Sequence, residues 1–305
     1  MNGTDKIESV DGSGTFEARY LAFLETITTL RPSLHRYCAR MTGSVMDGED
    51  VVQESLFEAY RKLDHFDESR PLKPWLFRIA HNRCIDFLRR KGVRDKAESA
   101  AAVPNVGESA EPILETATAV EHLVLTLPPK ERACILLKDV FDYSLEEISE
   151  LVESTVGGVK TALNRARTKL AESPPPAKAA QSVSPELKQI MQLYVDRFNR
   201  RDWDGVRELT AADARLRVAE KYAGKLAQAP YFANYERWPW PWKLAVGDVD
   251  GEAVVIILRH DAGKWTPHSA IRLEVISHRI ERIEDYLHCP WLLPAAASVS
   301  LAGPS

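Results

Sequence analysis

The chain has 305 residues, of which 45% are hydrophobic, and a formal net charge of −4 at pH 7. This length predicts two or three small domains with true hydrophobic cores, and the charge excludes a protein that is basic throughout. The four cysteines are far apart, and no stretch has the pattern of a signal peptide or a membrane span. We therefore expect a cytoplasmic protein with free thiols, no metal and no cofactor.

The sequence alternates between periodic segments and stretches that break periodicity. Two segments carry apolar residues at helical spacing, and a third ends in β-rich runs. The predicted fold class is therefore multidomain, with two all-α helical domains followed by an α+β domain. The predicted segments are a disordered leader at 1–14, a helical domain at 15–96, an acidic flexible linker at 97–118, a second helical domain at 119–171, a Pro/Ala/Ser linker at 172–184, the α+β domain at 185–293 and a tail at 294–305.

The first helical domain contains a helix with acidic residues on one side. Asp47 is a candidate N-cap, and acids at positions 49 and 50 suit the helix dipole. The residues expected on the buried face are Val52, Leu56, Ala59, Tyr60 and Leu63, and those on the opposite face are Asp50, Gln53, Glu54 and Glu58. By pattern alone the acidic face is either a solvated surface or a surface for a partner.

The next segment has the opposite charge. Between Arg70 and Lys96 nine basic residues face only two acids, a net charge of nine minus two, or +7. The apolar stripe is Leu76, Ala80, Cys84 and Phe87, and largely outside it lie Arg78, His81, Asn82, Asp86 and Arg89. Such a helix can place arginines on phosphates and offer amide and carboxylate groups to bases. Trp75, just ahead of the helix, is expected to be a core residue rather than a stacking platform.

The second helical domain has the pattern of a helix-turn-helix. Ser144 followed by Glu147 forms a capping box for a short helix, and a turn at Glu153 leads to a second helix that begins near Thr155. That second helix carries basic residues and no acid as far as Leu170. In such motifs the second helix enters the DNA major groove. The alternative is an ordinary helical hairpin with a solvated basic face.

At this point the first domain can be compared with a known family. The stretch "DGEDVVQESLFEAYRKLDHFDESRPLKPWLFRIAHNRCIDFLRRKG" resembles region 2 of the sigma-70 family, in its extracytoplasmic-function group. The resemblance implies that the acidic helix docks on the clamp helices of core RNA polymerase, through Asp50, Gln53 and Glu54. It also implies that the loop 67–73 and the basic helix read the minus-ten promoter element as melted single strand. The implied contacts are Arg78, Asn82, Arg83, Asp86, Arg89 and Arg90.

The second domain carries a matching resemblance. The stretch "LPPKERACILLKDVFDYSLEEISELVESTVGGVKTALNRARTKL" looks like sigma region 4, which binds the minus-thirty-five element and the polymerase flap. The implied contacts to duplex DNA are Thr155, Gly157, Gly158, Lys160, Thr161, Asn164, Arg165 and Arg167. Two residues depart from the family pattern, because Glu153 stands where glycine is frequent and Ala162 where arginine is frequent. The resemblance further implies that the acidic linker threads polymerase channels that otherwise hold nucleic acid.

The third domain opens with a capped helix at Ser184 and Pro185 and continues as helix, strand and further β-rich runs. It resembles the SnoaL-like (ketosteroid-isomerase-like) superfamily, whose α+β cone would here modulate sigma activity. The residues of a possible ligand pocket are Tyr231, Tyr235, Trp238, Trp240 and Trp242, which with two prolines predict an extended segment or loop; packing is the alternative. Candidates for isomerase chemistry, by residue type only, are Asp213, Glu220, Asp285, Tyr231, Tyr235, His268 and Arg272. We do not expect retained turnover.

These patterns predict an alternative sigma factor, with core RNA polymerase and promoter DNA as partners, a possible small ligand of the third domain and no membrane. Two alternatives remain open at this point. One is a one-component transcription regulator in which the helix-turn-helix binds DNA and the third domain senses a ligand. The other is an isomerase or cyclase with helical appendages.

Overall fold

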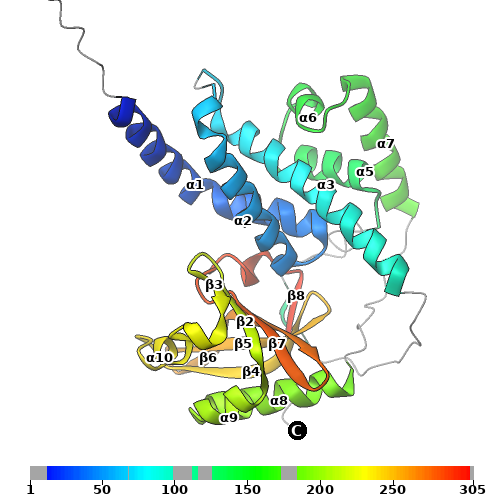
Figure 1. Cartoon of the computed structure of the whole chain (residues 1–305). Helices are drawn as coiled ribbons and strands as arrows, with labels where there is room; N and C mark the ends of the chain where they lie inside the picture. Colours follow the sequence, from blue (N-terminus) through cyan, green and yellow to red (C-terminus); the bar gives the residue numbers. More distant parts are fainter. Residues whose placement is uncertain (1–11, 68, 99–111, 116–125, 173–183, 303–305) are drawn as a thin grey trace, which may run out of the picture.

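The computed structural model describes residues 12–67, 69–98, 112–115, 126–172 and 184–302, and Figure 1 shows helices at one end of the molecule and a sheet at the other. The helical elements are α1 (Gly12–Thr42), α2 (Val45–Arg61), η1 (Leu63–His65), α3 (Leu72–Glu98), α5 (Pro129–Ile135), the π-helical turn η2 (Leu136–Val140), α6 (Leu145–Leu151) and α7 (Val156–Glu172). Among the described residues no helix is both long and apolar enough to cross a bilayer.

The start of α2 corrects one expectation from the sequence. The N-cap is Ser44, whose side chain accepts a hydrogen bond from the backbone N–H of Asp47, and Asp47 lies inside the first turn. Both residue types favour N-caps, but only Ser44 has the extended backbone that a cap requires. The capping box of Ser144 and Glu147 at α6 is confirmed, and the second helix of the motif begins at Val156, one residue from the predicted start.

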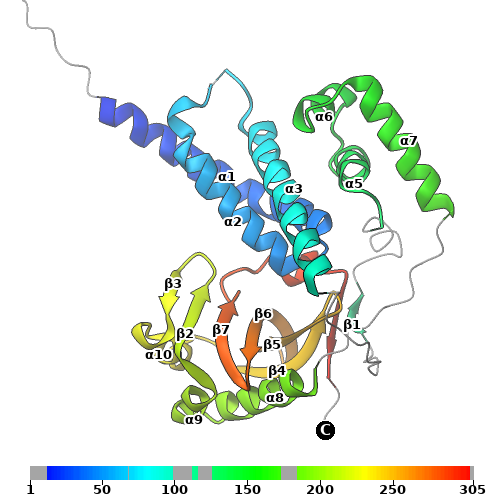
Figure 2. The ribbon, with the colours of Figure 1, turned by 45° about the vertical axis from the view of Figure 1, so that its right-hand side comes forward.

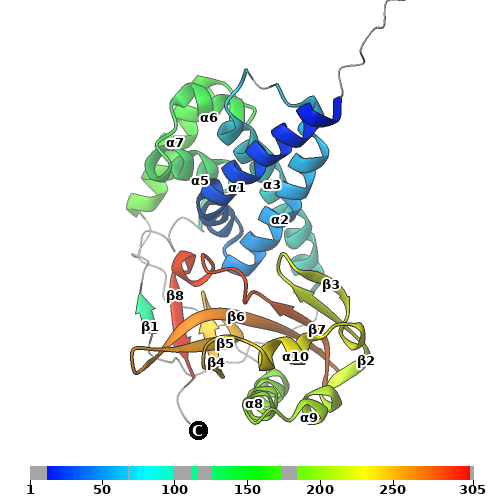
Figure 3. The same ribbon diagram turned by 90° about the vertical axis from the view of Figure 1, so that its left-hand side faces the viewer.

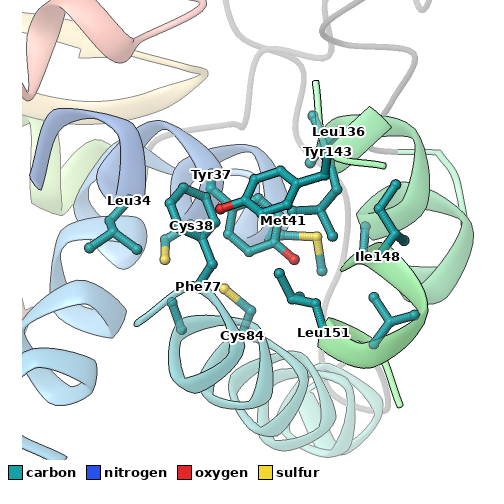
Figure 4. Close-up of a cluster of buried hydrophobic side chains, with 14 of the residues drawn as sticks. Leu34, Tyr37, Cys38, Met41, Phe77, Cys84, Leu136, Tyr143, Ile148 and Leu151 are labelled. Carbon is teal, nitrogen blue, oxygen red and sulfur yellow. The ribbon is translucent and has the colours of Figure 1, made fainter. Parts of the chain in front are cut away.

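The two helical segments pack on a single hydrophobic core, which Figure 4 shows. Tyr37 of α1 and Phe77 of α3 contact Phe141, which follows η2, with ring centroids 5.9 and 5.4 Å apart. Arg132 of α5 donates to the carbonyl of Met41 at the end of α1. Regions that the sequence presents as two domains therefore form one helical unit in this structure.

The α+β prediction for the third domain is confirmed. Its elements are α8 (Pro185–Asn199), α9 (Trp203–Glu208), β2 (Thr210–Val218), β3 (Tyr222–Lys225), η3 (Leu226–Gln228), α10 (Tyr231–Glu236), β4 (Trp242–Val249), β5 (Glu252–Asp261), β6 (Lys264–Ile276), β7 (Arg279–Asp285), η4 (Leu293–Ala295) and β8 (Ser298–Leu301). With β1 (Pro112–Glu115) they form an eight-stranded sheet in the order β1-β8-β4-β5-β6-β7-β2-β3. Every described pairing is antiparallel except that of β2 with β7.

Both faces of the sheet are buried, and β5 shows why. Its continuous apolar run sends Val255 and Ile257 into a cluster with α8, α9 and α10, while Val254 and Ile256 join a second cluster on the other face. Alternate residues of a strand point to opposite faces, so a run without polar interruptions needs cover on both sides. The second cluster is completed by residues of α1 and α2, which lie above the sheet in Figure 1.

Three segments differ from the sequence-based expectation. Residues 231–236 form the helix α10 and not an extended segment or loop. The prolines at 239 and 241 lie beyond the last residue of the helix, so they limit its length but do not prevent it. Residues 298–301, expected in a tail, form β8 and pair with β4. The expected linker at 97–118 contributes β1, which pairs with β8. The predicted leader and the two linkers otherwise lie largely outside the described residues.

Candidate functional site

The acidic side of α2 faces the C-terminal domain. Asp50 forms an ion pair with Arg217 of β2 and accepts a hydrogen bond from the Tyr286 hydroxyl at 3.3 Å. Asp47, one turn earlier, accepts from Arg272 of β6 at 2.9 Å. The two arginines come from neighbouring parts of the sheet and contact successive turns of one helix. The face that the sequence left open as solvated or partner-binding is therefore occupied by the C-terminal domain at its first residue, Asp50.

A third acid of α2 lies deeper in the same contact. Glu49 is fully buried, pairs with Arg31 of α1 and accepts from the Trp291 indole at 2.8 Å. Arg31 also pairs with Glu220 at 2.6 Å, and its guanidinium lies 4.7 Å from the Trp291 ring centroid. A buried carboxylate needs such partners, since an unpaired charge away from water is strongly destabilising.

Apolar side chains close the rest of the contact. Ala39, Val45 and Met46 of the helical unit are at most 3% exposed and belong to the same cluster as Leu292 and Leu293. Arg40 donates to the carbonyl of Ala295 at 2.8 Å. A contact that combines a dry apolar centre with hydrogen-bonded charges resembles a specific interface rather than two domains that touch by chance.

Burial and neighbouring charges shift the pKa values of the ionisable groups in this contact in opposite directions. Burial raises the pKa of Asp50 to about 6, although the hydrogen bond and charge of Arg217 act in the other direction. Burial also opposes the charge of Arg272, but the carboxylates around it, Glu252 and Asp47 among them, raise its pKa well above the ordinary value. Glu252 accepts from Arg272 at 2.6 Å. If the domains separated, Asp50 would lose Arg217 and Asp47 would lose Arg272, whereas Glu252 and Arg272 both belong to the C-terminal domain and would stay paired.

The other two predicted polymerase-binding residues are less involved. Gln53 is half-buried and donates to Glu49 at 3.2 Å. Glu54 is exposed and lies 3.7 Å from Arg90 of α3. The structure therefore covers the N-terminal part of the acidic face, at Asp50, more fully than the part that follows.

The predicted minus-ten residues share one exposed side of α3. Arg78, Asn82, Arg89 and Arg90 are exposed, while Arg83 and Asp86 are half-buried. Several are engaged within the chain: Arg83 donates to Glu58 at 2.6 Å, Arg89 to Asp86 at 3.2 Å and Arg78 to Glu153 at 3.2 Å. The last pair joins α3 to the turn of the helix-turn-helix. Trp75, expected in the core, is half-buried and packs on Phe66.

The predicted minus-thirty-five residues face solvent along α7. The exposed ones are Thr155, Gly157, Lys160, Thr161, Asn164, Arg165 and Arg167, and Gly158 is half-buried. Ala162, which departs from the family pattern, is only 7% exposed and packs in the helical core. The side of α7 that carries the predicted DNA contacts therefore remains open, while the acidic side of α2 is covered at Asp50.

The predicted ligand-pocket residues belong to an aromatic cluster in the C-terminal domain. Tyr231 and Tyr235 are buried and donate to the Asp285 carboxylate at 2.8 and 2.7 Å. Burial raises the pKa of Asp285. Trp242 is also buried, whereas Trp238 and Trp240 are half-buried and lie against His288 and His268. The residues thus come together, mostly in the packed interior.

Sequence reasoning assigned some residues elsewhere and missed others. Glu220 and Arg272, named as candidates for an isomerase pocket, instead contact α1 and α2. Arg217, Tyr286 and Trp291 received no role, because nothing near them in the sequence signals a partner so distant along the chain. Within the described residues, no group of three or more His, Cys, Asp or Glu side chains could hold a metal ion.

Comparisons with known proteins cover both helical segments. Residues 26–94 match the family described as Sigma-70 region 2, and residues 117–170 match Sigma-70, region 4. The chain is 33% identical over 162 residues to the ECF RNA polymerase sigma factor SigW of Bacillus subtilis, a match that covers 49% of this chain and 87% of that protein.

Two solved structures cover further parts of the chain. The extracytoplasmic function sigma factor SigJ of Mycobacterium tuberculosis is similar over 86% of this chain and 95% of that chain, with 16% identity and a TM-score of 0.36. A protein from Kribbella flavida assigned as a ketosteroid isomerase is similar over 32% of this chain and 75% of that chain, with 22% identity and a TM-score of 0.26.

Proposed function

Because this chain belongs to the extracytoplasmic-function group of the sigma-70 family, whose members bind core RNA polymerase and promoter DNA and are not enzymes, we propose that its C-terminal domain controls when it can do so. The sigma segments bind polymerase through the acidic side of α2 and the flap through region 4. They read the minus-ten element, melted, with α3 and the minus-thirty-five element, as duplex, with α7. All of this takes place in the cytoplasm.

One observation supports the control step above all others. Asp50, the first of the residues expected to dock on the polymerase clamp helices, is paired with Arg217 of the C-terminal domain. A carboxylate cannot serve both partners at once, and the same holds for the surface around Asp47 and Arg272. The C-terminal domain and polymerase therefore compete for one side of α2, and the compact chain is the inactive form.

The experiment measures binding to purified core polymerase and run-off transcription from a matched promoter. We expect the double variant Arg217→Ala/Arg272→Ala to bind core polymerase about tenfold more tightly, since couplings between sites are typically worth 1–3 kcal/mol. Arg215→Ala is the matched control, because Arg215 lies two residues away on the same side of β2 and is exposed. Truncation after Glu172 should have an effect in the same direction.

Two results would contradict the proposal at different levels. If the full chain and the truncated chain both fail to bind polymerase and to initiate transcription, the sigma function is wrong for this protein. If the chain initiates transcription but the double variant binds polymerase no better than Arg215→Ala, the sigma function stands and the control by the C-terminal domain falls. A one-component regulator, in contrast, would give α2 and α3 no role at all.

A further inference from the structure

A strand from the segment between the two sigma regions lies at the edge of the C-terminal sheet. β1 follows α3 in the sequence, yet it pairs antiparallel with β8, as Figures 2 and 3 show. Pro112 lies opposite Ser300, Leu114 opposite Val299 and Glu115 opposite Ser298. The segment that joins region 2 to region 4 is thus hydrogen-bonded to a domain that follows both of them.

The edge of β8 is built to accept an extended chain. On its inner side β8 pairs with β4, through Val249 opposite Val299 and Asp248 opposite Ser300. The carboxylate of Asp250 accepts from the backbone N–H groups of Ala297 and Ser298, which fixes the start of the strand. The outer side of such a strand offers a row of backbone donors and acceptors, and adding a peptide strand is a recurring mode of recognition.

The strand pair of β1 and β8 is short, so few main-chain hydrogen bonds stabilise it. β1 has four residues, and Pro112 at its start has no N–H to donate. The register also shifts between Pro112 and Leu114. A short ladder of main-chain hydrogen bonds at a sheet edge can form and separate without unfolding either partner, which suits a reversible contact.

We propose that the outer edge of β8 is a binding site for residues 112–115 of this chain, and that their pairing holds the linker away from polymerase. The inference rests on the proposed function and on the family resemblance, which implies that the same linker enters polymerase channels. A backbone that is paired with β8 cannot enter a channel at the same time. The C-terminal domain therefore restrains two parts of the sigma unit independently: the acidic side of α2, through side chains, and the linker, through its backbone.

A reversible cross-link tests the proposal in the full chain. In Glu115→Cys/Ser298→Cys the two new thiols stand at directly opposite positions of the strand pair, close to the reach of a disulfide. The described native cysteines are all buried, so mild oxidation should act on the new pair. We expect the oxidised variant to lose run-off transcription at least tenfold and dithiothreitol to restore it. The single variants Glu115→Cys and Ser298→Cys, treated with the same oxidant, are the controls.

Hydrogen exchange on the free protein gives a readout that does not depend on polymerase. Replacing residues 112–115 by Gly-Ser-Gly-Ser keeps the linker length and should speed amide exchange in residues 298–301 at least tenfold, while exchange in β5 stays unchanged. The proposal is overturned if the cross-link does not form, if the cross-linked chain transcribes as well as the reduced one, or if exchange in β8 does not change. If neither the reduced variant nor the chain truncated after Glu172 transcribes, but exchange in β8 is faster, the sigma function is contradicted and the strand-binding site stays in place.

Discussion

Glu153 has a backbone conformation that its side chain does not favour. In the turn between α6 and α7 its φ is +50°, a region that non-glycine residues rarely adopt. The residue is held there although glycine would fit without strain. Its carboxylate contacts Arg78 of α3, a predicted promoter contact, through an ion pair in which both side chains are more than half exposed. An exposed pair of this kind is worth about 0–1 kcal/mol.

We therefore expect Glu153→Gly to raise the free energy of unfolding, by about 0.5–1 kcal/mol, because relief of left-handed strain exceeds the loss of the ion pair. Urea denaturation measures the change. Asp142→Gly is the matched control, since Asp142 has a φ of +54° and a side chain that is 99% exposed. A loss of stability in Glu153→Gly together with a gain in Asp142→Gly would show that the contact with Arg78 outweighs the strain.

His81 makes the helical core sensitive to acid. Burial lowers its pKa from the ordinary 6.5 to about 4, and its Nδ1 is hydrogen-bonded to the Tyr37 hydroxyl at 2.8 Å. The unfolded chain gains a proton below pH 6.5, whereas the folded chain does so only near pH 4. The neutral His81 therefore does not lower the free energy of unfolding above pH 6.5. As the pH falls from 6.5 toward 4, the free energy of unfolding decreases by up to about 3 kcal/mol.

The variant His81→Gln should lack this pH dependence because its amide does not titrate. Urea denaturation of the wild type and the variant at pH 7.5 and pH 5 would show it as a smaller drop in stability for the variant. Equal drops in the two proteins would mean that other groups cause the acid sensitivity.

At the scale of single residues the sequence predicted one side of the interface and not the other. Helical spacing placed Asp50, Gln53 and Glu54 on one face of α2; of the three, Asp50 contacts the C-terminal domain, and their role in binding polymerase stays a prediction. The sequence could not predict the partners of these acids, because Asp50 and Arg217 are separated by 167 positions in the chain and Asp47 and Arg272 by 225. Only the folded sheet brings those arginines to α2.

Among the secondary-structure elements, α7 carries the clearest charge pattern. Its exposed side combines Lys160, Arg165 and Arg167, and of these Arg167 also donates to Asp139 at 2.9 Å. A lysine or arginine that contacts a phosphate contributes about one unit to the salt dependence of DNA binding.

We expect Lys160→Ala and Arg165→Ala each to weaken binding of a minus-thirty-five duplex and to lower the slope of log affinity against log salt by about one. Fluorescence anisotropy over a series of KCl concentrations measures both effects. Lys169→Ala is the control on the same helix, because Lys169 pairs with Glu131 at 2.8 Å. If the Lys160 and Arg165 variants bind like the control, α7 is not the recognition helix.

Elements with local signals were predicted, and elements defined by their neighbours were not. The caps at Ser144 and Ser184 follow from adjacent residues, and both are present. β8 has only four residues and no distinguishing period, so its existence depends on pairing with β4. The same is true of β1, whose strand conformation depends on β8.

On the scale of the whole molecule, the compact helical unit cannot read a promoter as it stands. The minus-ten and minus-thirty-five elements are about 25 base pairs apart, or roughly 85 Å at 3.4 Å per step. Here α3 and α6 share one core, and the ring centroid of Phe77 in α3 lies 5.5 Å from that of Tyr143, just before α6. Regions 2 and 4 must therefore separate when the chain binds polymerase and DNA.

Energy transfer between dyes would detect this separation. With dyes on cysteines introduced at Asn82 and Asn164, both exposed, we expect high transfer in the free protein and a large fall when core polymerase is added. A pair at Lys62 and Asn82, within region 2, should not change. Unchanged transfer in the first pair, with polymerase bound, would contradict the need for opening.

The domain order was predictable, but the compact arrangement was not. Periodicity and linker composition separated the three segments, because each signal is local. The contact between them depends on surfaces that only folding creates, such as the second apolar face of the sheet. The uninterrupted apolar run of β5 did indicate that both faces of the sheet are covered, since a strand buried on both sides needs a second covering layer.

Because the C-terminal domain follows the sigma segments in the sequence, it is also the last part of the three to be translated. The sigma segments leave the ribosome first, and the roughly 130 residues after α7 follow on the order of 10 s later at about 5–20 residues per second. Until the C-terminal domain emerges and folds, the acidic side of α2 lacks Arg217 and Arg272, and the linker lacks β8. On the proposed mechanism, each newly made molecule therefore passes through a brief period in which polymerase can bind it before the C-terminal domain covers α2 and the linker.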